Sequence, residues 1–127
     1  GAIIDPEQPY GRDALVGIGL IQTHLAESGM ECRVLRKCSP DHVISKNKIP
    51  LPEGADADQL LAGFEKAHAE DDINTVDGVK VDMPEGWVHL RKSNTEPIIR
   101  LYAEAGSSEE AERIAGEAMQ TINELIN

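Results

Sequence analysis

Three strand-like runs within 25 residues of one another constrain the fold of this chain more than any other feature: residues 79–83, 87–90 and 98–103. The first run alternates apolar and polar residues, which is typical of a strand with one buried face. Asp77-Gly78 leads into it, and Pro84-Glu85-Gly86 separates it from the second run; both are turn sequences. These runs predict neighbouring strands of an antiparallel sheet.

Two helices are expected to cover this sheet. Asp56 can cap the first, in which Leu60, Leu61, Phe64 and Ala67 share one face. Ser107 and Glu110 form a capping box for the second, whose apolar residues recur at helical spacing: Ala111, Ile114, Ala115, Ala118, Ile122, Leu125 and Ile126. The expected fold class is therefore α+β, with three or four strands in a small antiparallel sheet and two helices on one face.

The first 38 residues follow a different pattern. Residues 12–28 predict a helix that Gly29 ends, residues 31–35 predict a short strand, and Ile3-Ile4 resembles the end of another strand. Pro40, Pro50 and Pro52 then predict an extended connector, with an edge strand over residues 43–49. We therefore divide the chain into an α/β remnant at residues 1–38 and a compact domain at residues 39–127.

Charge and composition exclude several classes of partner. The formal net charge is −11, so binding to nucleic acid is disfavoured, and no run of apolar residues is long enough for a membrane span. Cys32 and Cys38 have no partner pattern for a metal or disulfide framework. We expect free thiols in the reducing cytoplasm, no nucleic-acid or membrane partner, and no metal ligands in this chain.

The polar segment between the last two strands is the candidate site. Arg91 offers a planar fork of donors that matches phosphate oxygens, Ser93 and Thr95 offer hydroxyls, and Asn94 offers an amide. Backbone N–H groups of such a loop can also turn toward an anion. The same residue types are ordinary in surface turns, so composition alone leaves a plain polar turn equally open.

Residues 91–100, which read RKSNTEPIIR, resemble the signature R-x-S-N/G-T-E-P-x-x-R of the α-D-phosphohexomutase superfamily. The segments Asp77–Lys80, Trp87-Val88 and Tyr102–Ala105 and the terminal helix agree with the same family, as does the segment Tyr10–Leu15. The resemblance implies a C-terminal domain with the fold of the TATA-box-binding protein, preceded by the end of the third domain.

The resemblance also implies a function. The loop would hold the phosphate of a hexose phosphate or bisphosphate that is not reacting during 1,6-phosphoryl transfer. Apart from the resemblance, a carboxylate within an anion loop indicates that Glu96 holds a basic residue, such as Arg100, from the far side. Lys92 lies in the same segment but is not counted among the phosphate-binding residues. The residues that match the family's phosphate-binding positions are Arg91, Ser93, Asn94 and Thr95, with Arg100 as support for the loop.

No catalytic residue is expected here, because the family's phosphoserine, its sugar-selecting loop and its Asp-x-Asp-x-Asp loop for Mg²⁺ do not occur in this sequence. The chain is thus expected to be part of a longer phosphoglucomutase/phosphomannomutase, inactive alone, without a cofactor of its own, and partnered by the enzyme's other domains. Asn94 favours this branch over phosphoglucosamine mutase, which stays an alternative, as does a non-catalytic α+β binding module.

Overall fold

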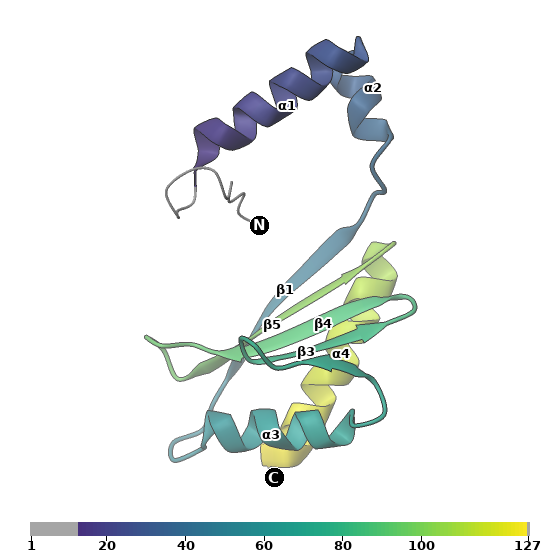
Figure 1. The fold of residues 1–127 in the computed structure, drawn as a ribbon. Coiled ribbons are helices and arrows are strands. Elements are labelled where there is room, and N and C mark those ends of the chain that lie inside the picture. Colours follow the sequence, from purple (N-terminus) through teal and green to yellow (C-terminus); the bar gives the residue numbers. More distant parts are fainter. Residues whose placement is uncertain (1–12, 127) are drawn as a thin grey trace. The chain divides into compact units, whose positions relative to one another are not determined.

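The computed structural model describes residues 13–126 and divides the chain into two compact units, Gly1–Pro40 and Asp41–Asn127. Within residues 13–126, the first unit contains two helices, and the second contains a five-stranded sheet with two helices (Figure 1). Whether the first unit is the end of a third domain stays a prediction. No helix in the described part of the chain is long and apolar enough to cross a membrane.

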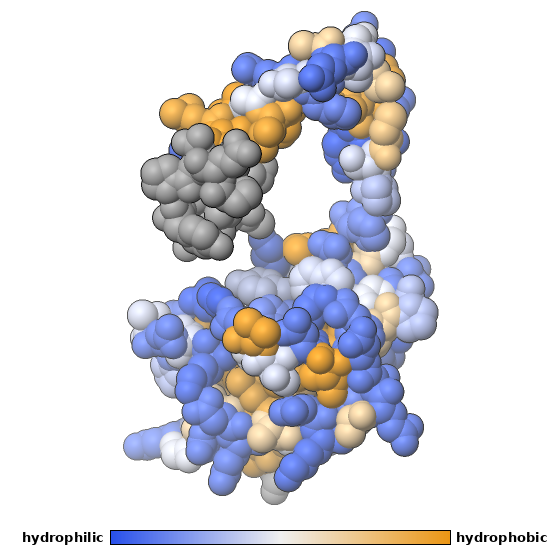
Figure 2. All heavy atoms as spheres, in the orientation of Figure 1, coloured by the Kyte–Doolittle hydropathy of each residue, from blue (hydrophilic) through white to orange (hydrophobic). Residues whose placement is uncertain are grey.

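The first element in the described part of the first unit is α1 (Ala14–Ser28), which confirms the helix predicted there. Arg12 lies outside the described residues, as does the strand end expected at Ile3-Ile4. Asp13 caps the helix, because its Oδ1 accepts hydrogen bonds from the N–H groups of Leu15 and Val16 at 2.8 and 3.2 Å. Gly29 ends the helix with a left-handed φ of 63°. The apolar stripe of α1 is largely exposed and forms a hydrophobic band in Figure 2.

The strand predicted over residues 31–35 is wrong. The structure has a short helix there, α2 (Cys32–Lys37). Six residues are too few for a helical period to become visible in a sequence, whereas Val34-Leu35 resembles a fragment of a strand. The basic residues Arg36 and Lys37 occupy the last turn, where positive charge is favourable for a helix.

The second unit is built on one antiparallel sheet in the order β1-β5-β4-β3-β2. The expected edge strand is β1, and the three strand-like runs are β3, β4 and β5. One strand was not predicted: β2, which pairs with β3. The strands are β1 (Val43–Pro50), β2 (Asp72–Asn74), β3 (Val79–Met83), β4 (Gly86–Lys92) and β5 (Ile98–Ala105).

Both helices of this unit pack on the same face of the sheet, as predicted. α3 (Ala57–Ala67) contacts β3 and β4, and α4 (Ser108–Ile126) contacts β1, β4 and β5 (Figure 1). Asp56 and Ser107 cap them, since each accepts a hydrogen bond from a backbone N–H of the first turn. The expected α+β class is confirmed, with five strands where three or four were predicted.

The core lies between the sheet and these helices. On β5 the buried residues Ile99, Leu101, Ala103 and Ala105 alternate with half-buried residues on the other face, as the pleat requires. Most of the apolar positions predicted for the helices are buried; Ala67 and Leu125 are exposed. The helix residues in the core are Leu60, Leu61, Phe64, Ala111, Ile114, Ala115, Ala118 and Ile122.

An ion-pair network joins α4 to the turn between β3 and β4. The Arg113 guanidinium donates to Glu117 at 2.8 Å and to Glu85 at 3.1 Å. These contacts raise the pKa of Arg113, first through the hydrogen bond to Glu117. Arg113 is thus a paired surface cation away from the candidate site.

Candidate anion-binding pocket

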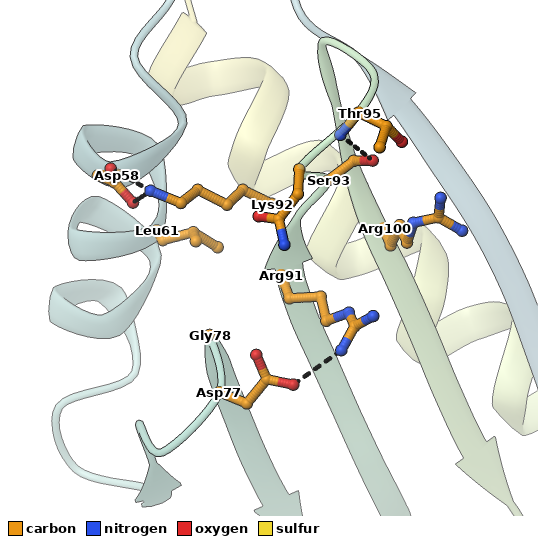
Figure 3. A pocket seen from close by; sticks show the side chains of 10 residues that line it. Asp58, Leu61, Asp77, Gly78, Arg91, Lys92, Ser93, Thr95 and Arg100 are labelled. Atoms are coloured by element: carbon orange, nitrogen blue, oxygen red, sulfur yellow. Dashed lines mark hydrogen bonds and ion pairs between the residues drawn. The ribbon is translucent and has the colours of Figure 1, made fainter.

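A pocket of about 360 Å³ lies where β4 ends and β5 begins. It is bounded by the β4–β5 loop, by the turn that enters β3 and by the first turns of α3 (Figure 3). All five residues predicted to hold phosphate line it. The lining residues are Asp58, Leu61, Asp77, Gly78, Arg91, Lys92, Ser93, Asn94, Thr95 and Arg100.

The loop is held in a defined shape by its own backbone. The Ser93 N–H donates to the carbonyl of Ile98 at 3.0 Å, and the Ile98 N–H donates to the carbonyl of Glu96 at 2.8 Å. The carbonyl of Pro97 accepts the N–H of Leu51 at 2.9 Å, which ties the loop to the end of β1. The segment therefore folds back on the sheet and closes one side of the pocket.

At the loop tip, residues with hydroxyl and amide donors line the pocket. The Thr95 N–H lies 3.5 Å from Ser93 Oγ, the outer limit of a hydrogen bond, and Figure 3 shows both residues at the top of the concavity. Asn94 lies between them in the lining. Because a 3.5 Å contact is weak, the Ser93 hydroxyl and the Thr95 N–H can turn to an incoming anion at small cost.

Arg91 is the residue of β4 that brings a guanidinium to the pocket. Its Nη1 donates to Asp77 Oδ2 at 2.8 Å, and the side chain is 45% exposed. Asp77 belongs to the turn before β3, which the register sets beside the end of β4 through the Val79–Leu90 pair. Arg91 therefore reaches the pocket already paired on one edge, with its remaining N–H donors available.

Lys92 leaves β4 on the opposite face of the sheet, as strand alternation requires. Its Nζ lies 2.6 and 2.8 Å from the two carboxylate oxygens of Asp58, in the first turn of α3. No local feature of the sequence indicated this contact. Lys92 is therefore turned toward α3 and occupied by its carboxylate.

Arg100 lies on β5, directly opposite Arg91 in the register. Its Nη2 is 3.5 Å from Glu96 Oε2, and Lys48 Nζ is 3.8 Å from the same oxygen. The interpretation that Glu96 holds a basic residue from outside the pocket agrees with this contact. Arg100 thus lines the pocket while one edge of its guanidinium is held at the base of the loop.

Four pocket residues were missed by sequence reasoning: Asp58, Leu61, Asp77 and Gly78. The Asp77-Gly78 pair was recognised as a turn, but its closeness to Arg91 depends on the strand register. Among the residues that the structure describes, no three His, Cys, Asp or Glu side chains gather as ligands for a metal ion. The described residues therefore do not fit the Mg²⁺ that the family resemblance implies for the whole enzyme.

Comparison with known proteins gives the family. Residues 48–121 match the model for "Phosphoglucomutase/phosphomannomutase, C-terminal domain". The chain is 31% identical to a phosphoglucomutase/phosphomannomutase of Thermococcus kodakarensis and 29% identical to a probable phosphoglucosamine mutase of Methanopyrus kandleri. Each match covers 99% of this chain and 28% of the relative.

A solved structure supports the same fold. The crystal structure of a phosphoglucomutase/phosphomannomutase family protein from Burkholderia thailandensis matches the whole chain with a TM-score of 0.66 and 24% identity. The chain covers 28% of that protein. The family match extends over β2, β3, β4, β5 and α3, over α4 as far as residue 121, and over every residue of the pocket. The chain belongs to the phosphoglucomutase/phosphomannomutase family, within the α-D-phosphohexomutase superfamily, and carries its C-terminal domain.

Proposed function

We propose that this chain supplies the phosphate-holding part of a phosphohexomutase. In this proposal the pocket holds the phosphate of a hexose phosphate or bisphosphate that is not being transferred, while other domains of the enzyme carry out 1,6-phosphoryl transfer. The observation that carries the proposal is the pocket that gathers Arg91, Ser93, Asn94, Thr95 and Arg100.

The chemistry of the lining suits a phosphate monoester. A guanidinium can donate two parallel hydrogen bonds to phosphate oxygens, and hydroxyl and backbone N–H donors can bind the remaining oxygen. Charge-assisted hydrogen bonds of this kind contribute about 1.5–3 kcal/mol each when shielded from water. A chain of net charge −11 can bind an anion only through such local positive groups.

In this proposal the pocket positions the substrate and takes no part in forming or breaking bonds. None of its groups is a nucleophile paired with a base, so its role is to hold one end of the sugar while the other end reacts. Since the chain covers 28% of the relatives that it matches, we propose that the phosphoryl donor and the Mg²⁺ site belong to other domains of the enzyme. On this account the chain alone does not catalyse the reaction.

The preferred sugar divides the proposal into two branches. Asn94 favours a phosphoglucomutase/phosphomannomutase, whereas the similarity to a phosphoglucosamine mutase supports an amino-sugar phosphate. Both branches need the same phosphate pocket. The full-length enzyme, assayed with glucose 1-phosphate, mannose 1-phosphate and glucosamine 1-phosphate, decides between them.

NMR titration of the chain with glucose 6-phosphate and inorganic phosphate tests the shared part. We expect amide shifts at Ser93, Asn94 and Thr95, and their loss in Arg91→Ala. Arg113→Ala is the matched control, because Arg113 is also 45% exposed and paired with carboxylates, but lies outside the pocket. Wild-type protein without shifts in the loop at millimolar ligand, or equal losses in both variants, would refute the proposal.

A further inference from the structure

Every basic side chain of the pocket is paired with a carboxylate, and two of these carboxylates line the pocket themselves. A carboxylate in the wall of an anion site repels the anion. It can favour binding only if another of its contacts stabilises the bound state by more than this repulsion costs. The pairs are Arg91 with Asp77, Lys92 with Asp58, and Arg100 with Glu96.

Asp77 differs from the other two carboxylates because its turn is fixed against β4. Gly78 has a φ of 79°, and a Cβ at this position would lie 2.2 Å from the Leu90 carbonyl oxygen and 2.8 Å from Arg91 Cβ. The ring Nε2 of His89 also hydrogen-bonds the carbonyl oxygen of Asp77. The turn therefore lies directly against β4, with Gly78 beside Leu90 and Arg91 and with Asp77 bonded to His89.

The fixed turn determines where one edge of the Arg91 guanidinium lies. Asp77 Oδ2 accepts from Nη1, and in Figure 3 Asp77 lies on the other side of the guanidinium from Ser93 and Thr95. A planar guanidinium held on one edge keeps its other donors in one orientation. Without that partner, a side chain that is 45% exposed would sample several rotamers and lose entropy when an anion binds.

We propose that Asp77 is a positioning residue, which orients the Arg91 guanidinium toward an anion in the pocket. The inference rests on the proposed function. It makes a prediction opposite in sign to simple electrostatics, since removing a nearby negative charge should by itself strengthen anion binding. Loss of Asp77 should instead weaken phosphate binding by about three- to tenfold, the cost of ordering one free side chain.

The test uses the whole chain, inorganic phosphate as the probe, and the variants Asp77→Ala and Asp77→Asn. Asn keeps a neutral acceptor for Arg91, so its affinity should lie between those of the wild type and Asp77→Ala. Asp82→Ala and Asp82→Asn are matched controls: Asp82 is an exposed carboxylate on β3 that pairs with Lys80 outside the pocket. They should bind phosphate as the wild type does.

A second readout follows Arg91 directly. The Arg91 Nε–Hε resonance of the free protein should shift and broaden in Asp77→Ala, while backbone amides remote from the turn keep their positions. If either Asp77 variant binds phosphate as tightly as the wild type or more tightly, the positioning role is refuted. That outcome is distinct from failure of the proposed function, in which the wild type itself does not bind. If Asp77→Ala disturbs the fold, Asp77→Asn decides.

Discussion

An alanine at position 78 would place its Cβ against the backbone of β4. The nearest atoms are the Leu90 carbonyl oxygen at 2.2 Å, Arg91 Cβ at 2.8 Å and Arg91 Cα at 3.0 Å. These atoms belong to a strand paired on both sides, so they cannot move aside without loss of hydrogen bonds. The φ of 79° adds a second penalty, because a side chain is rarely stable there.

The two penalties have separate magnitudes. A non-glycine residue in the left-handed region costs about 1–2 kcal/mol, and overpacking in a close-packed site costs about 1–3 kcal/mol more. Gly78→Ala should therefore lower the free energy of unfolding by about 2–5 kcal/mol. A small domain unfolds with a free energy of about 5–15 kcal/mol, so the loss is a large part of the total.

Urea unfolding monitored by the fluorescence of Trp87, the single tryptophan, measures this change. Gly54 and Gly116 serve as controls, since a Cβ added at either position would meet nothing within 4 Å beyond its own chain neighbours. Gly54 has a φ of 85°, so Gly54→Ala should cost only the backbone term of about 1–2 kcal/mol. Gly116 lies inside α4, and Gly116→Ala should gain about 0.5–1 kcal/mol. The reasoning is refuted if Gly78→Ala is no more destabilising than Gly54→Ala.

Three further predictions concern the pocket and the core. Arg91→Lys should weaken phosphate binding about tenfold or more by titration, since an ammonium lacks the planar fork; an unchanged Kd would contradict this. Lys92→Ala should change that Kd less than about fivefold, because Lys92 leaves β4 on the opposite face of the sheet and is turned toward Asp58 of α3. A loss as large as that of Arg91→Lys would place Lys92 in the site. Phe64 is fully buried, so Phe64→Ala should lower the free energy of unfolding, measured in urea, by about 3–5 kcal/mol. Val76 is 91% exposed, so Val76→Ala should change it by less than about 0.5 kcal/mol. Similar values for the two variants would contradict the described core.

The sheet and its helices were predictable because their signals are local. The alternation over Val79–Met83, the Ser107 cap and the apolar face of residues 60–64 each depend on residues a few positions apart. The β4–β5 loop could likewise be picked out, since its donors are consecutive in sequence. Its residues lie together in the pocket mainly because they are neighbours in the sequence.

The errors come from short elements. β2 has three residues, of which Ile73 alone is half-buried with an exposed neighbour on each side, so alternation cannot be recognised. It becomes a strand through its pairing with β3, for example Ile73 with Val81. α2 has only six residues, and its first and last turns overlap. In both cases tertiary contacts or helix-end charges decide the structure, and periodicity does not.

The carboxylates of the pocket could not be predicted for a different reason. Asp77 is 14 residues from Arg91, and Asp58 is 34 residues from Lys92. Each pair forms because the strand register and the packing of α3 bring distant segments to the end of β4. From the sequence alone Asp77 was part of a turn, and nothing local indicated that either acidic residue pairs with the cations of the loop.

The central claim is that the β4–β5 loop encloses a phosphate group, and a crystal structure of the chain with glucose 6-phosphate tests it most directly. We predict the phosphate within hydrogen-bonding distance of the Arg91 guanidinium, the Ser93 hydroxyl and the Thr95 N–H, with the sugar directed out of the pocket. A structure in which the ligand phosphate binds elsewhere, with this loop turned outward and Arg91 directed away from it, would contradict the claim.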